Sequence, residues 1–276
     1  MSRSGALCLG LVLATAACDS QIVLGDSDSE PGLPLAGAPG KSNSDVGAIL
    51  GPGQLVWSTD HEVGDFSDWE RGGTLSGGEY DWGGADGYVD AGVGRNESNG
   101  VVANIDSVPR NDTSSGVRMY RRIEPTPAYY RCWFRLEEAH SVADWWSIFL
   151  FHATDENIDP AHEVWLWDLR VVDLPSGEMA LQFFDHDVMQ GRLSPGSGLI
   201  QPQKWFELSA YLDYRPPNDT RLVVWLDGAQ LFDMKALHTA AHSIVLWSVG
   251  NGASQLAPEE GTLYLDDAAV LQAAAP

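Results

Sequence analysis

Short hydrophobic runs with a two-residue alternation dominate the chain from Leu55 onward. They are rich in β-branched and aromatic residues and are separated by Gly, Pro, Asn or Asp, which favours strands over helices. The run 205–214, WFELSAYLDY, is representative, because every second residue is apolar and the others are polar or aromatic. Its predicted core face consists of Phe206, Leu208, Ala210 and Leu212. The runs cover 101–108, 116–123, 128–136, 145–153, 163–172, 178–186, 205–214, 221–228, 243–250 and 261–270.

Turn residues between these runs indicate antiparallel neighbours. Asp227 and Gly228 form a favoured two-residue hairpin turn, and the residues 175–177, Pro-Ser-Gly, separate two further runs. No segment keeps a helical stripe over three turns, and only residues 234–242 suit one short helix. A chain of about ten to twelve short strands with few helices predicts an all-β fold, an antiparallel sandwich of two sheets.

The first residues have the pattern of an export signal. Arg3 precedes the apolar run 5–17, which is too short to span a bilayer and suits the hydrophobic part of a signal peptide. The following junction with Cys18 resembles a bacterial lipobox, in which the signal is removed before a Cys that then carries a lipid. The resemblance implies a signal peptide at 1–17 and an exported protein anchored to the cell envelope by a lipid on Cys18. Export without a lipid is the alternative, because Thr15 stands where the pattern prefers Leu.

Residues 18–54 are rich in Gly, Ser, Pro and Asp and show no sustained periodicity. They predict a flexible tether in front of a folded region at 55–272. The lipid is the only membrane attachment we expect, because no later run reaches the roughly 18 apolar residues of a transmembrane helix. Cys8 leaves with the signal and Cys18 takes the lipid, so Cys132 has no disulfide partner and is expected to be a buried small hydrophobic residue.

The charge of the chain excludes two classes of partner. The sequence has 39 acidic residues against 16 Lys and Arg, so its formal net charge is −23. Nucleic acids and anionic lipid head groups are bound by clustered basic residues, and a chain of this charge is unsuited to either. Hydrophobic residues make up 44% of the chain and charged residues 20%, which is ordinary for a folded globular protein.

Several of the strand sequences resemble the concanavalin A-like lectin and glucanase superfamily. The resemblance implies two curved antiparallel sheets in a jelly-roll sandwich, with any ligand on the concave face. The superfamily contains lectins, glycoside hydrolases and polysaccharide lyases, so the fold does not choose among these functions. The matching segments are DFSDWE at 65–70, WFE at 205–207, VWLDG at 224–228, WSVG at 247–250 and GTLYLDD at 261–267.

Carbohydrate binding is the leading functional interpretation, with a polysaccharide or glycan as the partner. The predicted strand faces away from the core mix aromatic with polar side chains, and such a mixture stacks on sugar rings while it hydrogen-bonds their hydroxyls. Trp165 and Trp167 are expected to share one face, because they alternate along a strand. The candidate ligand-binding residues are Arg131, Trp133, Arg135, Trp165, Trp167, Trp205, Glu207 and Trp225.

A lyase that acts on an acidic polysaccharide by β-elimination is the alternative. Elimination at a uronate requires a cation or amide near the carboxylate, a base for the C5 proton and an acid for the leaving oxygen. The arginines and aromatic residues of 118–122 and 131–135 alternate on two consecutive strands and predict one basic-aromatic patch; ion pairs with nearby acids are their other interpretation. A loose resemblance to alginate-lyase-type enzymes implies a catalytic set of Arg118, Arg122, His152, Gln182, His186 and Tyr211.

Two further considerations complete the sequence-based picture. A retaining glycosidase needs two carboxylates on one strand face, whereas the spacing of Glu163 and Asp168 predicts opposite faces. No cofactor is required, but sandwiches of this kind often tie their first and last strands through a structural calcium ion. The candidate calcium ligands are Asp60, Glu62, Asp266 and Asp267.

A third functional interpretation is an envelope protein with a structural or partner-binding role and no sugar site.

Overall fold

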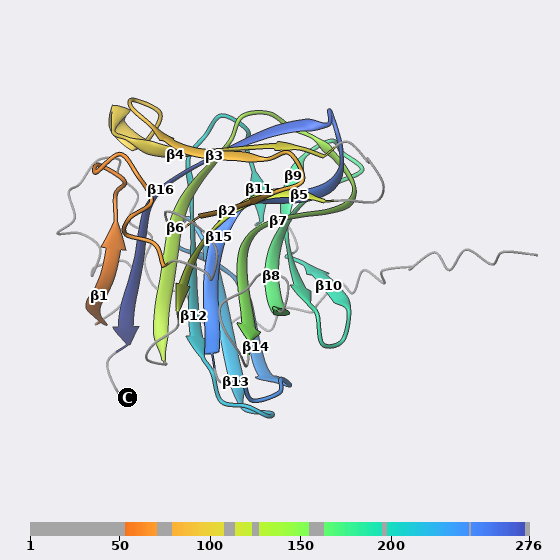
Figure 1. Ribbon diagram of the computed structural model, residues 1–276. Coiled ribbons are helices and arrows are strands. Elements are labelled where there is room, and N and C mark those ends of the chain that lie inside the picture. Colours follow the sequence, from red (N-terminus) through yellow and green to blue (C-terminus); the bar gives the residue numbers. More distant parts are fainter. Residues whose placement is uncertain are drawn as a thin grey trace, which may run out of the picture.

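Two antiparallel sheets stacked face to face form the protein in the computed structural model (Figure 1). The structure describes residues 53–70, 79–107, 114–122, 127–154, 163–194, 198–242 and 244–273. The expected signal peptide, Cys18 and nearly all of the expected tether therefore lie outside the described residues. The all-β sandwich expected from the alternation of the sequence is confirmed.

The two sheets, here called sheet A and sheet B, each contain eight strands. In order across sheet A these are β14 (Ala229–Leu237), β13 (Thr220–Leu226), β12 (Phe206–Asp213), β6 (Ala128–Leu136), β16 (Glu260–Ala273), β4 (Gly100–Asp106) and β3 (Asp86–Asp90), with β1 (Gly53–Thr59) paired to β16. Sheet B runs β10 (Gln190–Leu193), β9 (Met179–Asp185), β8 (Val164–Asp173), β7 (Ser141–Thr154), β15 (Ile244–Ala257), β5 (Ser115–Arg122) and β2 (Glu79–Trp82), with β11 (Leu199–Ile200) paired to β9. One short 3₁₀ turn, η2 (Arg95–Glu97), precedes β4.

All ten hydrophobic runs form strands, and one prediction of a helix was wrong. Residues 229–237 form β14, which pairs with β13 through the tight turn at Asp227 and Gly228, both with positive φ. Along β14, Phe232 and Met234 are buried while Lys235 is exposed, so the strand buries one face against the sandwich. A hairpin partner supplies backbone hydrogen bonds that the sequence of 234–242 does not reveal, and this pairing overrides the helical pattern.

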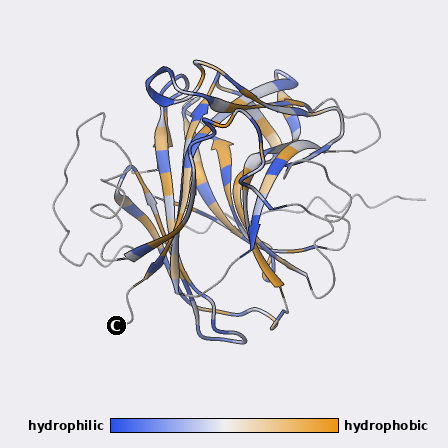
Figure 2. Ribbon diagram, turned by 60° about the vertical axis from the view of Figure 1, so that its left-hand side comes forward, coloured by the Kyte–Doolittle hydropathy of each residue, from blue (hydrophilic) through white to orange (hydrophobic). Residues whose placement is uncertain are grey.

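The core lies between the sheets, and one buried amide links the two sheets across it. Alternating side chains of both sheets fill it, as the alternating hydropathy along the strands in Figure 2 shows. Asn251 is fully buried; it accepts a hydrogen bond from Trp146 Nε1 at 2.7 Å and donates to the carbonyls of Ala103 and Gly261. One amide therefore connects β15 of sheet B to two strands of sheet A. Cys132 is a free, fully buried core residue, as expected.

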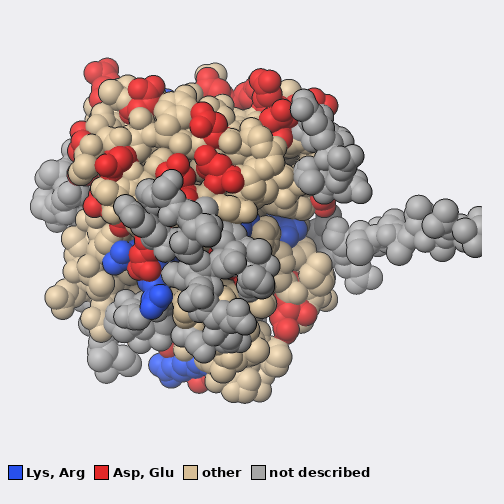
Figure 3. Space-filling model, in the orientation of Figure 1, with Lys and Arg blue, Asp and Glu red and all other residues tan. Residues whose placement is uncertain are grey.

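Acidic side chains are prominent on the surface, and on the face drawn in Figure 3 they gather toward the top of the view. Basic side chains are fewer there and lie lower down. Within the described part of the chain, the structure contains no helix of the length and apolar character needed to cross a bilayer.

Candidate functional site

Three neighbouring strands of sheet B place polar side chains on the face that points away from the core. β15 lies between β5 and β7, and its residue Ser248 is opposite Tyr120 on one side and Leu150 on the other. His152 is opposite Leu246 of the same strand, and the ring centroids of Tyr120 and His152 are 5.2 Å apart. We call this outer surface, with Arg118, Tyr120, His152, Glu163 and Trp165, the Arg118 face.

Arg118 is a nearly buried cation held between two indoles. Its guanidinium carbon lies 4.9 Å from the ring centroid of Trp82 and 4.3 Å from that of Trp165, and both rings are partly exposed. Only 4% of Arg118 is exposed, yet Nε and Nη2 have no hydrogen-bond partner, and it forms no ion pair with any acid of the described residues. Buried N–H groups normally have acceptors, so these two nitrogens are an exception in the described part of the chain.

His152 and Glu163 form a second buried pair on the same face. Nδ1 of His152 lies 2.8 Å from Oε2 of Glu163, and both side chains are fully buried. Burial lowers the pKa of His152, although Glu163 opposes this change, so the imidazole is neutral near pH 7. Burial also raises the pKa of Tyr120, although the neighbouring Arg118 opposes this change, so the phenol is protonated near pH 7. The face therefore holds a neutral imidazole and a protonated phenol beside a cation.

A β-bulge in β8 brings Trp165 and Glu163 to this face. In the pairing of β7 with β8, Phe151 is opposite Trp167, but the next residue, His152, is opposite Trp165. The extra residue reverses the alternation, so Trp165 contacts Arg118 while Trp167 is buried in the core. The prediction that the two tryptophans share a face was wrong for this reason.

The same bulge overturns the prediction that Glu163 and Asp168 point to opposite faces. Glu163 contacts His152 on the outer face of sheet B, and Asp168 contacts Arg170 and His186 on that face. A spacing of five residues separates two side chains across a regular strand, but an inserted residue restores them to one side.

Asp168 is the centre of a second polar group on the outer face of sheet B. Its buried carboxylate lies 2.9 Å from Nε of Arg170 and 3.4 Å from Nε2 of His186. Burial alone would raise the pKa of Asp168, but His186 and Arg170 hold it below the ordinary value, so the group is ionised. The guanidinium of Arg170 also stacks on Phe184, 3.5 Å from the ring centroid. We call Asp168, Arg170 and His186 the Asp168 group.

The remaining candidates of the catalytic set are spread more widely. Gln182 on β9 pairs with Arg170 and carries its side chain over Gly191 of the edge strand β10. Arg122, at the end of β5, is exposed. Tyr211 belongs to β12 of sheet A, on the opposite side of the sandwich, where its ring lies 5.1 Å from that of Tyr129. The structure thus brings Arg118 and His152 together, places His186 with the Asp168 group, and separates Tyr211 from them.

The prediction of one basic-aromatic patch from 118–122 and 131–135 was also wrong. These segments are consecutive in the sequence, but β5 lies in sheet B and β6 in sheet A, so their outer faces are on opposite sides. A strand pattern gives the face of a residue within its own sheet and not which sheet it joins. On the outer face of sheet A lie Arg131, Trp133, Arg135, Trp205, Glu207, Tyr211 and Trp225.

The basic residues on the outer face of sheet A have protein partners. Nη1 of Arg131 lies 3.4 Å from Oε2 of Glu207, and burial raises the pKa of Glu207 against the effect of Arg131. Arg135 lies over the rings of Trp205 and Tyr264, at 5.2 Å and 4.1 Å. Arg131 therefore fits the ion-pair interpretation, whereas Nη2 of Arg135 donates to the carbonyl of Val93 and the residue forms no ion pair with a described acid.

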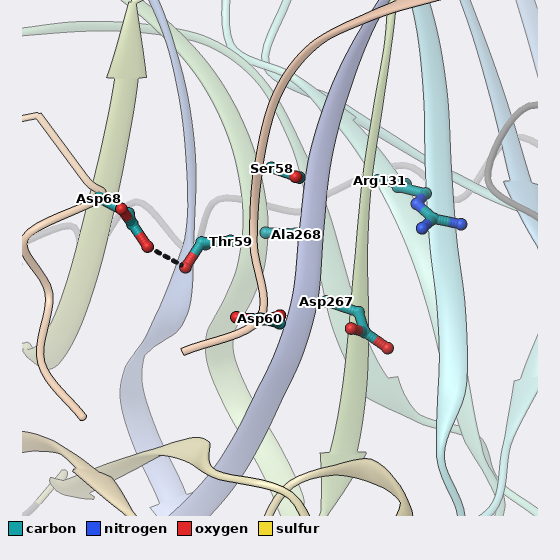
Figure 4. A pocket seen from close by; sticks show the side chains of 7 residues that line it. All are labelled: Ser58, Thr59, Asp60, Asp68, Arg131, Asp267 and Ala268. Atoms are coloured by element: carbon teal, nitrogen blue, oxygen red, sulfur yellow. Dashed lines mark hydrogen bonds between the residues drawn. The ribbon is translucent and has the colours of Figure 1, made fainter. Parts of the chain in front are cut away.

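The predicted calcium ligands do not converge on one point. Asp60 and Asp267 line a polar cavity of about 70 Å³ (Figure 4), whereas Asp266 lies apart from it and accepts hydrogen bonds from Ser98 Oγ and two backbone N–H groups. Glu62 accepts one from the backbone N–H of Asn99. Among the described residues, no three acidic, His or Cys side chains are arranged to hold a metal ion. Calcium binding stays a prediction. The cavity is lined by Ser58, Thr59, Asp60, Asp68, Arg131, Asp267 and Ala268.

Sequence reasoning missed two contributors to the Arg118 face. Trp82 lies in a glycine-rich segment and is not among the predicted site residues, but 79–82 form β2, which pairs with β5 and places the indole beside Arg118. The alternation of Tyr80 and Trp82 was the available signal. Glu163 was considered only with Asp168, and its contact with His152 could not be predicted because its face depends on the bulge.

Comparison with known proteins shows the fold. No protein-family model matches the chain, and no curated protein matches it in sequence. An endo-β-1,4-glucuronan lyase from the fungus Trichoderma reesei aligns with a TM-score of 0.58 and 11% identity, over 80% of this chain and 96% of that one. Alginate lyase Aly36B aligns at 0.52 and 14% identity, over 79% and 96% of the two chains, and the cellulose-induced protein Cip1 at 0.51 and 16%, over 77% and 95%. The chain therefore has the concanavalin A-like jelly-roll sandwich expected from the resemblance of its strands.

Proposed function

We propose that the protein binds an acidic polysaccharide on the Arg118 face. The observation that carries this proposal is the guanidinium of Arg118, which is 4% exposed, lies between two indoles and has two nitrogens without an acceptor. Adjacent guanidinium N–H groups match the two oxygens of a carboxylate, which is the group that distinguishes a uronate from a neutral sugar. The partly exposed rings of Trp82 and Trp165 suit the apolar faces of the pyranose rings on either side.

The structural neighbours support the choice of an acidic ligand. Two of those with the same fold are lyases named for glucuronan and alginate, both of which are polyuronates. The net charge of −23 disfavours a polyanion in general, so binding depends on the local field of Arg118. We therefore expect the protein to have no general affinity for anions and to lose its binding of uronates when Arg118 is replaced.

Elimination of the bound uronate is the second candidate function, and the pair of Tyr120 and His152 favours it. A base takes the proton from C5 of the uronate, the C4–O4 bond breaks as the C4=C5 double bond forms, and an acid protonates O4. The neutral imidazole of His152 suits the role of the base, and the protonated phenol of Tyr120 suits that of the acid. Arg118 would stabilise the negative charge that develops on the carboxylate.

The experiment measures binding and elimination on the same samples. Calorimetry with oligoglucuronate and oligoalginate tests binding, and the ultraviolet absorbance of an unsaturated uronate tests elimination. We expect Arg118→Gln to abolish binding of both ligands, whereas Arg221→Gln, which breaks an exposed ion pair with Asp233 on sheet A, leaves it unchanged. Full-strength binding by the Arg118→Gln protein contradicts the proposal. Binding without any rise in absorbance excludes the lyase function and supports binding without catalysis.

We also propose that the protein is exported and tethered through Cys18. Support for this part comes from the sequence alone, from the apolar run 5–17 and the small residues before Cys18. A Cys18→Ala protein should no longer incorporate labelled fatty acid and should leave the membrane fraction. Unchanged labelling in that variant contradicts the anchor without affecting the proposed ligand.

A further inference from the structure

Trp165 divides the outer face of sheet B into two parts with different chemistry. On one side, its ring lies 4.3 Å from the guanidinium of Arg118; on the other, 5.2 Å from the ring of His186. Arg118 and the Asp168 group therefore lie on either side of the indole of Trp165, which is itself partly exposed. A polysaccharide that crosses Trp165 presents adjacent sugar residues to these two parts.

The two parts differ in the donors that they leave free. Arg118 keeps two nitrogens without an acceptor. Arg170 uses Nε on both oxygens of Asp168, at 3.2 and 2.9 Å, and directs Nη2 to His186 at 3.5 Å. One arginine is thus open to an anion, whereas the other is already engaged by a carboxylate of the protein.

The acid of this part is Asp168 itself. Asp185 is opposite Trp167 and so lies on the core side of β9, and Asp187 pairs with His238, which follows β14 of sheet A, so neither belongs to the Asp168 group. A second carboxylate bound here would meet the carboxylate of Asp168, whose cation Arg170 is already engaged, which is unfavourable. A hydroxyl group, by contrast, can donate a hydrogen bond to Asp168.

From this asymmetry we propose that the preferred ligand is a heteropolysaccharide in which a uronate lies next to an uncharged sugar. The uronate carboxylate binds Arg118, and the neutral neighbour places its hydroxyls against the Asp168 group, with Trp165 between them. This inference rests on the proposed binding of acidic polysaccharide and narrows its class, because a homopolymer of uronates would place a carboxylate in both parts.

A matched series of oligosaccharides tests this preference without changing the glycosidic linkage. The series consists of β-1,4-linked oligoglucuronates, the same oligomers with half of their carboxyl groups reduced to hydroxymethyl groups, and cello-oligosaccharides, which have none. Calorimetry with the unmodified protein should give about tenfold tighter binding for the half-reduced oligomers than for the fully carboxylated ones. Cello-oligosaccharides should bind more weakly than either, because they leave Arg118 without an anion.

Each outcome separates the inference from the function beneath it. If fully carboxylated oligomers bind as tightly as the half-reduced ones or more tightly, the preference is refuted and the binding of polyuronates stands. If none of the three ligands binds, the proposed function itself fails. If the cello-oligosaccharides bind best, Arg118 is not an anion site.

A pair of variants examines the cause of the preference. Asp168→Asn removes the carboxylate that engages Arg170, and it should bring the fully carboxylated oligomers to within about twofold of the half-reduced ones. Asp213→Asn removes an acid paired with Arg215 on sheet A and should leave the tenfold difference intact. An unchanged preference in folded Asp168→Asn protein refutes the role of the Asp168 group, and the ligand series with unmodified protein remains decisive if that variant does not fold.

Discussion

Replacing Arg118 by Met should stabilise the protein while it abolishes ligand binding. Arg118 is 4% exposed, and Nε and Nη2 lack hydrogen-bond acceptors. Met has a similar length and no charge, and its thioether packs well beside the rings of Trp82 and Trp165. The substitution therefore removes a desolvated cation without leaving a large cavity.

The magnitude follows from opposing contributions. Each unsatisfied buried nitrogen costs about 1–3 kcal/mol, and both costs disappear with the guanidinium. The two cation–π contacts, worth about 0.5–2 kcal/mol each, are lost, and sulfur–aromatic contacts of about 0.3–1.5 kcal/mol partly replace them. From the middle of each range, the net effect is an increase of about 2 kcal/mol in the free energy of unfolding. For a folded region of this size, that raises Tm by about 4–8 °C.

Urea unfolding followed by Trp fluorescence, together with thermal unfolding, measures this change. Arg221→Met is the matched control: it removes an exposed arginine that pairs with Asp233 at 2.9 Å, and it should lower stability by at most about 1 kcal/mol. A loss of more than about 1 kcal/mol in Arg118→Met would show that the arginine is a structural component of sheet B. The argument that its charge is retained for a ligand would then be refuted.

Three other substitutions test the buried amide of Asn251, the position of the Trp82 indole and the protonation of Glu79. Asn251→Ala should lower the free energy of unfolding by about 3–5 kcal/mol, because it leaves the indole N–H of Trp146 and two carbonyls unpaired; a loss below about 1 kcal/mol in urea unfolding would contradict this. Gly116→Ala places a Cβ 2.2 Å from Cη2 of Trp82, so the indole must move away from Arg118 and the affinity for oligoglucuronate should fall about tenfold. Unchanged calorimetric affinity would exclude Trp82 from the site. Burial, helped by nearby acids, raises the pKa of Glu79 from 4.5 to about 7, so the folded state binds more protons than the unfolded state between these values and stability falls as pH rises. Glu79→Gln should therefore raise Tm at pH 8 and leave it unchanged at pH 4. The gain in the free energy of unfolding at pH 8 should be less than about 1 kcal/mol, because the group is partly exposed. Equal shifts of Tm at both pH values would refute the raised pKa of Glu79.

The alternation of the sequence was sufficient for the strands, because side chains of a strand buried on one face repeat every two residues. The core face of 205–214 and the turn at Asp227 and Gly228 follow directly from this local rule. Arg118 could also be selected as a candidate, because Arg118, Tyr120 and Arg122 alternate along one predicted strand. These features depend only on residues that are neighbours in the chain, and the sequence gives those neighbours directly.

The composition of the site was decided only by the tertiary structure. Pairing with β15 brings β5 and β7 to either side of that strand, while β6 joins the other sheet and takes Arg131 to the opposite face. The inserted residue in β8 turns Trp165 outward and Trp167 into the core, which a regular alternation cannot express. Strand partners and bulges are set by hydrogen bonds between segments far apart in the sequence. The energy of such a pairing depends on both strands, so the sequence of one strand does not determine its partner.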